Sequence, residues 1–262
     1  MKLDDVTISR AIVDTFFNKF RENMELDVAL VGAGPANLVA GMLLAEGGLR
    51  AAIFESKLAP GGGMWGGGMM FNEIVIQPSA RHILEKLGIR CREFKPGYLT
   101  ADSVECIASL IARCVSAGTN IFNLIKAVDV LFAEEKGQKK VNGLVLQWTP
   151  VEHLQMHVDP LAIRAACVVD GTGHPAEICE IVSRKMDVRL DTASGKVMGE
   201  RSMWAEQAEE MTLRNSGEIF PGLYVTGMAA NAARGAPRMG PIFGGMMLSG
   251  EKVAGELLKK LK

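Results

Sequence analysis

The chain has 262 residues, of which 48% are hydrophobic and 23% charged, and its formal net charge is -1. This composition is typical of a globular protein and excludes disordered, collagen-like and coiled-coil chains, and the near-zero charge argues against a nucleic-acid surface. No apolar run approaches the roughly 18 residues of a membrane span, and residues 1–25 lack the apolar core of an export signal, so no membrane contact is expected.

The first predicted element is an amphipathic helix over 5–23. Ile8, Ile12, Phe16 and Phe20 recur at helical spacing there. We expect this helix to pack on the outside of the core or on another subunit, and ordinary packing on the core is favoured. A strand over 27–31, a helix over 35–46 and a strand over 50–55 then form a βαβ unit of about 30 residues.

Strands and helices continue to alternate along the rest of the chain. Helices are predicted over 78–87, 102–117, 175–185 and 240–262, and strands over 121–125, 166–170 and the segment after Phe220. Two strands within about 127–148, joined by a charged turn over 134–140, form an antiparallel hairpin insertion. Residues 187–217 show no clear periodicity. The pattern predicts one α/β domain over 1–262, with a doubly wound, mostly parallel Rossmann-like sheet of the FAD/NAD-binding type.

Gly32 and Gly34 stand between the first strand and the next helix, where a dinucleotide fingerprint belongs. Glycine there allows a sharp turn and brings a pyrophosphate to the helix N-terminus, where free N–H groups favour negative charge. Glu55 ends the second strand, where a carboxylate can bind ribose hydroxyls. The third glycine position is Asn37, which indicates a slightly shifted helix, a polar contact with the ligand, or a tolerated substitution.

Two further segments bear on the ligand. Residues 60–68 contain six glycines in nine positions, and they form either a flexible lid or, as we favour, extended backbone held against a ligand. Residues 221–228 resemble the second cofactor segment of flavoproteins of this architecture, in which an Asp usually follows the glycine. Met228 stands in that position, which argues against a bound flavin.

Taken together, these residues resemble the thiamine thiazole synthase family, and its archaeal branch in particular. The matching segments are 31–35, 54–56, 60–69, 157–160, 170–175 and 238–250. The resemblance implies an enzyme of thiamine biosynthesis that builds ADP-5-ethyl-4-methylthiazole-2-carboxylate from NAD, glycine and sulfur and releases nicotinamide. NAD is then a substrate and the cofactor is iron(II). A homo-octamer with sites at subunit interfaces is also implied.

The resemblance relates the sulfur source to one position. Eukaryotic members donate the sulfur of a cysteine in Cys-x-Asp-Pro, and His157 stands at that position here. The implied enzyme therefore uses free sulfide and turns over repeatedly. His157 is also the best candidate for an acid–base group, with a mere spacer as the alternative. The five cysteines are odd in number and lack C-x-x-C spacing, so we expect reduced thiols and a cytoplasmic protein.

Asp159 and His174 are implied as the iron ligands, contributed by adjacent subunits, and both join His157 as catalytic candidates. Arg238 is implied to bind the glycine carboxylate, with Arg234 as a weaker candidate. From the residues alone, a structural His174 and a surface Arg238 remain alternatives. The implied nucleotide contacts are Gly32, Gly34, Ala36, Glu55, Ser56, Gly63, Val128, His157, Val158, Asp159 and Met228.

Three other functions fit parts of the sequence. A flavin-dependent oxidoreductase predicts a yellow protein with redox turnover. A sugar-phosphate isomerase predicts activity without glycine or sulfide. A non-catalytic NAD-binding sensor predicts binding without release of nicotinamide, and it leaves Asp159, His174 and Arg238 without a role.

Overall fold

The main sheet is mostly parallel and confirms the predicted fold class. The computed structural model describes residues 2–135 and 137–262, and its sheet has the order β10-β11-β9-β1-β2-β6, with β8 paired to both β9 and β7. Strand β1 pairs in parallel with β2 and β9. The strands of this sheet are β1 (Glu25–Val31), β2 (Ala51–Glu55), β6 (Asn120–Asn123), β7 (Ile125–Glu135), β8 (Gln138–Trp148), β9 (Leu161–Asp170), β10 (Gly217–Phe220) and β11 (Leu223–Val225).

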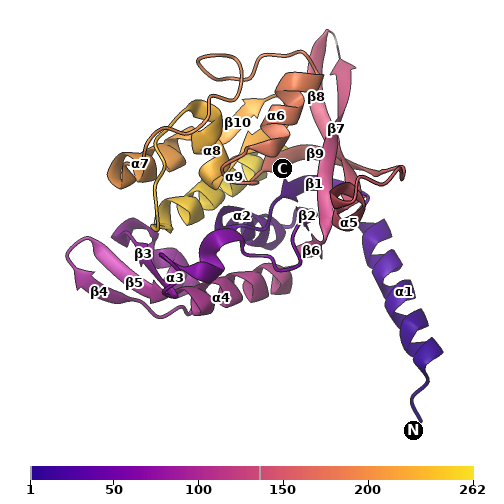
Figure 1. The fold of residues 1–262 in the computed structure, drawn as a ribbon, viewed down its shortest axis with the longest axis horizontal. Helices are drawn as coiled ribbons and strands as arrows, with labels where there is room; N and C mark the ends of the chain where they lie inside the picture. Colours follow the sequence, from indigo (N-terminus) through magenta and orange to yellow (C-terminus); the bar gives the residue numbers. More distant parts are fainter. Residues whose placement is uncertain (1, 136) are drawn as a thin grey trace.

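Helices cover both faces of this sheet, as a doubly wound fold requires. Side chains alternate along β1, so Val28 and Leu30 enter one hydrophobic core while Ala29 and Val31 enter the other. The first core is closed by α2 (Pro35–Glu46), α3 (Arg81–Leu87), α4 (Ser103–Ser116) and α9 (Gly244–Leu261), and the second by β7, β8, α6 (Glu177–Lys185) and α8 (Gly227–Arg234) (Figure 1).

The predicted hairpin insertion is present as β7 and β8, which pair antiparallel from Ile125–Trp148 to Glu135–Gln138. The strands are longer than expected and leave a shorter connection than the predicted turn over 134–140. Lys136, within that turn, lies outside the described residues. A short helix, α5 (Thr149–His153), follows β8.

Helix α1 (Asp5–Glu22) forms where predicted but does not pack as favoured. Its N-cap Asp4 accepts a hydrogen bond from the backbone N–H of Thr7 at 2.8 Å. Only Phe20 is buried, against the Phe122 ring, whereas Phe17 remains 60% exposed. Figure 1 shows the helix running away from the body of the molecule. The expectation of ordinary core packing is therefore wrong, and an apolar helix face stays uncovered in the single chain.

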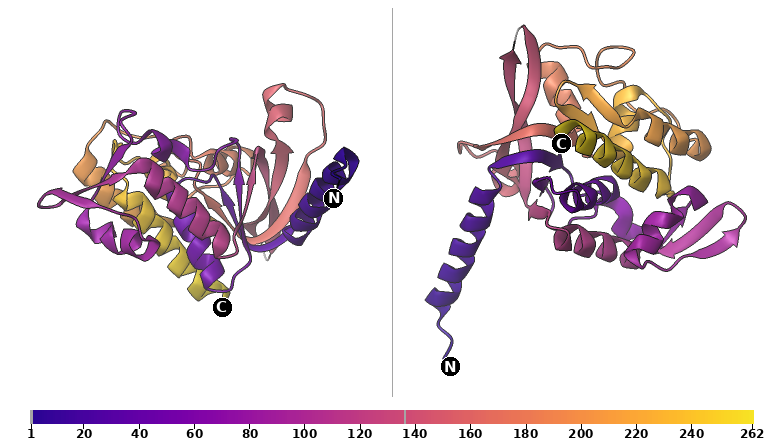
Figure 2. Two further views of the ribbon diagram at one scale, coloured as in Figure 1. Left: turned by 90° about the horizontal axis from the view of Figure 1, so that it is seen from below. Right: turned by 180° about the vertical axis from the view of Figure 1, so that it is seen from behind.

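Several elements were not predicted. A second, antiparallel sheet has the order β3-β5-β4 and lies at the opposite end of the molecule from α1 (Figure 2). The segment without clear periodicity contains α7 (Ala205–Asn215). The short elements are β3 (Glu73–Ile76), β4 (Arg92–Lys95), β5 (Tyr98–Asp102) and the 3-10 turn η1 (Gly62–Gly66). The helix predicted over 78–87 is present as a 3-10 turn, η2 (Pro78–Ala80), followed by α3. No helix within the described ranges is long and apolar enough to cross a membrane.

Candidate functional site

A cleft of about 640 Å³ opens at the carboxyl ends of the parallel strands. The ends of β1, β2, β9 and β11 meet there with the glycine-rich loop after β2 and the segment before α9. The structure places these predicted residues in its lining: Gly32, Gly34, Ala36, Glu55, Ser56, Gly63, His174, Met228 and Arg238. Residues from distant parts of the sequence therefore share one cavity.

The start of α2 offers a ready anion site in this cleft. Gly34 is the N-cap, Pro35 opens the helix, and neither a capping side chain nor an acidic residue occupies its first turn. The first N–H groups of the helix consequently remain available, and the helix dipole favours negative charge beside them. Gly32 has φ of +86° and packs against the Gly171 carbonyl, so only glycine fits this turn.

Glu55 is held rigidly beside that turn. It is buried, its Oε2 accepts a hydrogen bond from the Ala33 N–H at 2.8 Å, and its Oε1 accepts one from the Lys57 N–H at 2.7 Å. Each carboxylate oxygen has a further lone pair, so the group can also accept hydroxyl donors from a ligand in the cleft.

Asn37 joins the ends of β1 and β11 beneath the cleft. Its Nδ2 donates to the carbonyls of Val31 at 2.9 Å and Gly32 at 2.8 Å, and its Oδ1 accepts from the Thr226 hydroxyl at 2.7 Å. The side chain is buried and does not line the cleft. The interpretation of Asn37 as a ligand contact is therefore wrong. Asn37 stands where the fingerprint has its third glycine, and its side chain forms a hydrogen-bonded bridge inside the protein. That side chain leaves no space for a side chain at Gly171.

Asp170 shapes the turn that carries His174. It ends β9 fully buried, and its Oδ1 accepts hydrogen bonds from the N–H and hydroxyl of Thr172 at 3.0 and 2.7 Å. Its Oδ2 accepts from the N–H groups of Ile178 and Cys179 at 3.0 Å each, which anchors the start of α6. This carboxylate thus links the strand end, the turn and the next helix in one network.

His174 is oriented by a carboxylate that we did not predict. Its Nδ1 lies 2.7 and 2.8 Å from the two carboxylate oxygens of Glu200. The imidazole is 51% exposed, whereas the Glu200 side chain is only 15% exposed. A carboxylate on Nδ1 fixes the tautomer and leaves Nε2 for another partner, as in many metal-binding histidines. Glu200 lies in the segment without periodicity, so no sequence signal pointed to it.

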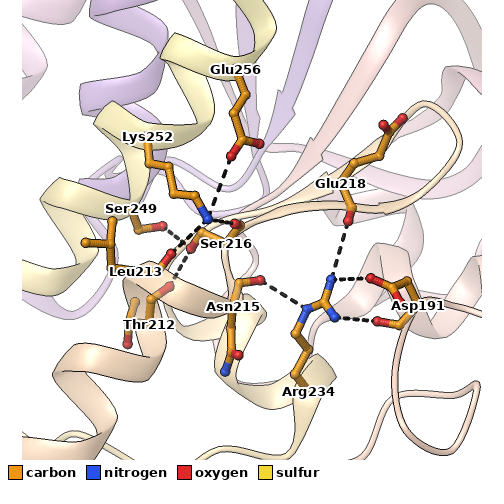
Figure 3. Close-up of polar contacts among 10 residues, drawn as sticks. All are labelled: Asp191, Thr212, Leu213, Asn215, Ser216, Glu218, Arg234, Ser249, Lys252 and Glu256. Atoms are coloured by element: carbon orange, nitrogen blue, oxygen red, sulfur yellow. Dashed lines mark hydrogen bonds and ion pairs between the residues drawn. The ribbon is translucent and has the colours of Figure 1, made fainter.

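Arg238 and Arg234 differ sharply in their surroundings. Arg238 is exposed in the cleft wall, and no hydrogen bond or ion pair engages its guanidinium in the part of the chain that the structure describes. Arg234 instead contacts the Asp191 carboxylate at 2.9 Å and the carbonyls of Asp191 and Asn215 at 2.6 and 3.2 Å (Figure 3). Arg234 is thus a structural residue outside the cleft lining. The prediction that it is a weaker candidate for binding the glycine carboxylate is wrong.

Four predicted residues do not reach the cleft within one chain. His157, Val158 and Asp159 lie on an exposed segment over 153–162, the arm, which projects beyond α5 in Figure 1. Val128 is half-buried on β7, where its neighbour Ala127 faces the cleft instead. The arm also exposes Leu154, Met156 and Val158, and the Gln147 amide donates a hydrogen bond of 2.8 Å to its Val158 carbonyl.

The Thi4 family matches residues 9–243 of this sequence. The chain belongs to the Thi4 family. It is 52% identical over its full length to the thiamine thiazole synthase of Desulfosudis oleivorans and to that of Methanothermobacter thermautotrophicus, and each is covered completely. The crystal structure of Thermovibrio ammonificans THI4 superimposes with a TM-score of 0.98 at 51% identity, with 99% of each chain covered.

The cysteines of this Thi4 chain lie away from the cleft. None of the five belongs to its lining, and four of them are buried. Burial raises the pKa of both Cys106 and Cys114 to about 12, so these thiols stay protonated and weakly nucleophilic at neutral pH. We therefore infer that the cysteines serve packing.

Within the described ranges, no group of three or more His, Cys, Asp or Glu side chains is placed to hold a metal ion. The cleft of one Thi4 chain contributes His174 with its Glu200 partner. The imidazole fits a borderline metal such as iron(II), but one ligand does not make a site.

Proposed function

We propose that this protein is a thiazole synthase of thiamine biosynthesis. It converts NAD, glycine and free sulfide into ADP-5-ethyl-4-methylthiazole-2-carboxylate, releases nicotinamide and turns over repeatedly in the cytoplasm. The observation that carries the proposal is the cleft, which joins a nucleotide-type loop to His174 and Arg238. Relatives half identical over the whole chain bear the name thiamine thiazole synthase.

The nucleotide half of the substrate is assigned to the first βαβ unit. The uncapped N-terminus of α2 would bind the pyrophosphate, and Glu55 with Ser56 would accept the adenosine ribose hydroxyls. Gly32, Gly34 and Gly63 would let the backbone approach the ligand closely, and Ala36 and Met228, which line the same cleft, would also contact it.

The glycine substrate is assigned to Arg238. Its guanidinium can form two parallel hydrogen bonds with a carboxylate, and the described residues supply no competing partner. Its segment is held in place, because the Arg238 N–H donates to the Arg201 carbonyl at 3.1 Å and its carbonyl accepts from the Trp204 N–H at 3.0 Å. The charged group therefore projects from a fixed backbone.

The metal centre is assigned to two subunits. His174 of one chain and Asp159 on the arm of a neighbour would hold iron(II), and His157 and Val158 would enter the same cleft. Bound iron(II) would supply a Lewis acid with open positions for small donors. The uncovered apolar side chains of α1 and of the arm support self-association, for which we propose a homo-octamer.

Free sulfide is assigned as the sulfur source. Histidine at position 157 has no sulfur to donate, and the five cysteines lie outside the cleft. Formation of the thiazole requires glycine to condense with a carbonyl group and water to be lost. The imidazole of His157 would move protons in these steps, which proceed next to carbonyl groups.

The first experiment is an anaerobic incubation of the full-length protein with NAD, glycine, sulfide and iron(II), followed by liquid chromatography with mass detection. We expect ADP-thiazole in molar excess over enzyme, and only when sulfide is present. Product limited to one equivalent without sulfide would contradict the sulfide assignment. Binding of NAD without nicotinamide release would contradict the synthase and favour a sensor, whereas activity on a sugar phosphate alone would favour an isomerase.

Glu200 provides a second prediction. Replacing it with alanine frees the His174 imidazole to rotate and to change tautomer, so we expect metal affinity to fall about 10- to 100-fold. Anaerobic titration calorimetry with iron(II) or cobalt(II) measures this directly, and Glu200→Gln should recover part of the loss. Glu206→Ala, an exposed acidic position on α7, is the matched control. Equal affinities for Glu200→Ala and wild type would show that Glu200 does not orient the ligand.

A further inference from the structure

A buried carboxyl group lies behind the cleft wall, outside the proposed chemistry. Glu209 on α7 is only 9% exposed, and it meets Gln77 and the start of α9. Its Oε2 accepts hydrogen bonds from the Gln77 Nε2 at 2.5 Å and from the Gly245 N–H at 2.6 Å. These contacts join three elements that are far apart in the sequence.

Two oxygens at this junction lack donors. Among the described residues, the Oε1 atoms of both Gln77 and Glu209 are buried without a hydrogen-bond partner. An ionised carboxylate only accepts hydrogen bonds, so an ionised Glu209 would leave both oxygens unsatisfied. A neutral carboxylic acid has one O–H donor, and a carboxylic acid and a carboxamide can pair through two reciprocal hydrogen bonds. A single proton therefore satisfies both atoms.

We propose that Glu209 is held as a neutral carboxylic acid, that its Oε1–H donates to the Oε1 of Gln77, and that this acid–amide pair positions the cleft wall over 238–246. On one side of that wall, the Phe243 N–H donates to the Val75 carbonyl of β3 at 3.0 Å. On the other side, Glu209 accepts from the Gly245 N–H. The pair thus fastens the segment that carries Arg238 to both β3 and α7.

The close fit at the start of α9 supports the pair. A side chain at Gly244 would meet the Gln77 amide oxygen, and one at Gly245 would meet the Glu209 carboxyl group. Two successive glycines therefore leave room for these groups, so that the helix backbone, rather than a side chain, packs against them.

Burial and the helix dipole have opposite effects on the ionisation of Glu209. The N-terminus of α9 favours a negative charge, but removal from water disfavours it, and burial is the main cause that raises the pKa of Glu209 above the ordinary glutamate value. No charged side chain of the surrounding elements forms a hydrogen bond or ion pair with Glu209 in the described part of the chain. Those side chains are Glu73 on β3; Arg81, His82, Glu85 and Lys86 on α3; Glu206, Glu210 and Arg214 on α7; and Glu251, Lys252, Glu256, Lys259 and Lys260 on α9.

The proposal predicts a signed pH dependence. A neutral Glu209 in the folded state has a raised pKa, so its stabilising effect is complete below the unfolded value of 4.5 and is lost as the pH rises through the folded pKa. Glu209→Gln keeps the shape and the Gly245 contact but has no proton to lose. The compared quantity is the melting temperature of Glu209→Gln minus that of wild type. This difference should be about 3–6 °C larger at pH 8 than at pH 4.

The test combines thermal unfolding across this pH range with two local readouts on the full-length protein. Infrared difference spectra of wild type against Glu209→Gln should show one protonated carboxyl band at pH 7. Hydrogen exchange over 238–246 should accelerate in Glu209→Ala and be restored in Glu209→Gln. The exposed neighbour Glu210→Gln is the control and should change none of these. No protonated band, with a melting difference that grows toward low pH, would overturn the proposal and indicate an ionised Glu209 bridged by water.

Discussion

Asp159→Ala and His174→Ala should each lower the rate of thiazole formation by at least about 100-fold. A mixture of the two variants should regain activity. Within one chain, His174 lines the cleft while Asp159 lies on the exposed arm, outside its lining. If the arm enters a neighbour's cleft, an intact cleft from the Asp159 variant can combine with an intact arm from the His174 variant. No intact pair exists in either variant alone.

The regained activity has an expected size. In an equal, random mixture, half of the clefts and half of the arms are intact, so about a quarter of the sites receive both intact residues. Co-expression with two affinity tags isolates the mixed oligomers, and thiazole formation per site is then measured. Pairing the double variant with Asp159→Ala is the control, because no intact arm is present. Inactive mixed oligomers would show that the two residues do not complete each other across an interface.

Asp170→Ala is expected to lower the free energy of unfolding by about 3–5 kcal/mol, and with it the melting temperature by roughly 10 °C or more. The carboxylate is fully buried and accepts hydrogen bonds from four donors, three of them backbone N–H groups. Without it, these donors remain buried with no acceptor. The His174 turn should loosen as well, since Asp170 joins that turn to the start of α6.

Asp102→Ala gives a matched comparison for this prediction. Asp102 also caps a helix, but it is exposed and accepts a single backbone N–H, that of Glu105, at 2.8 Å. Water can replace that acceptor, so the expected loss is only about 0.5–2 kcal/mol. Chemical denaturation of both variants measures the difference. Similar losses for the two variants would show that the buried network around Asp170 contributes no more than an ordinary helix cap.

Local chemistry explains which parts of the fold were predictable. The βαβ unit and the helix after Asp102 were predicted closely, because alternation, helical spacing, caps and terminal glycines act within a few residues. The glycine pattern also located the sharp turn that precedes α2. By contrast, the short strands β3, β4 and β5 carry little periodicity of their own, and they form a sheet only because they pair with one another.

Helix α1 shows the limit of such patterns. Its apolar spacing predicted the helix correctly, but spacing says only that one face is apolar, not what covers it. In the single chain most of that face remains exposed. The arm likewise gave no sequence signal, because most of its residues belong to neither a helix nor a strand and so show no periodicity.

The sequence by itself determined the mostly parallel α/β fold, the glycine turn at the start of α2 and the side chains placed at strand ends, since each follows from interactions between near neighbours. Only the tertiary structure decided their partners. Asn37 proved to be a bridge to Thr226, Arg234 proved to be paired with Asp191, and Glu200 proved to orient His174. Contacts such as that between Gln77 and Glu209, 132 residues apart, depend on how whole layers stack. No local pattern encodes that stacking, because it results from the burial of all the apolar faces together.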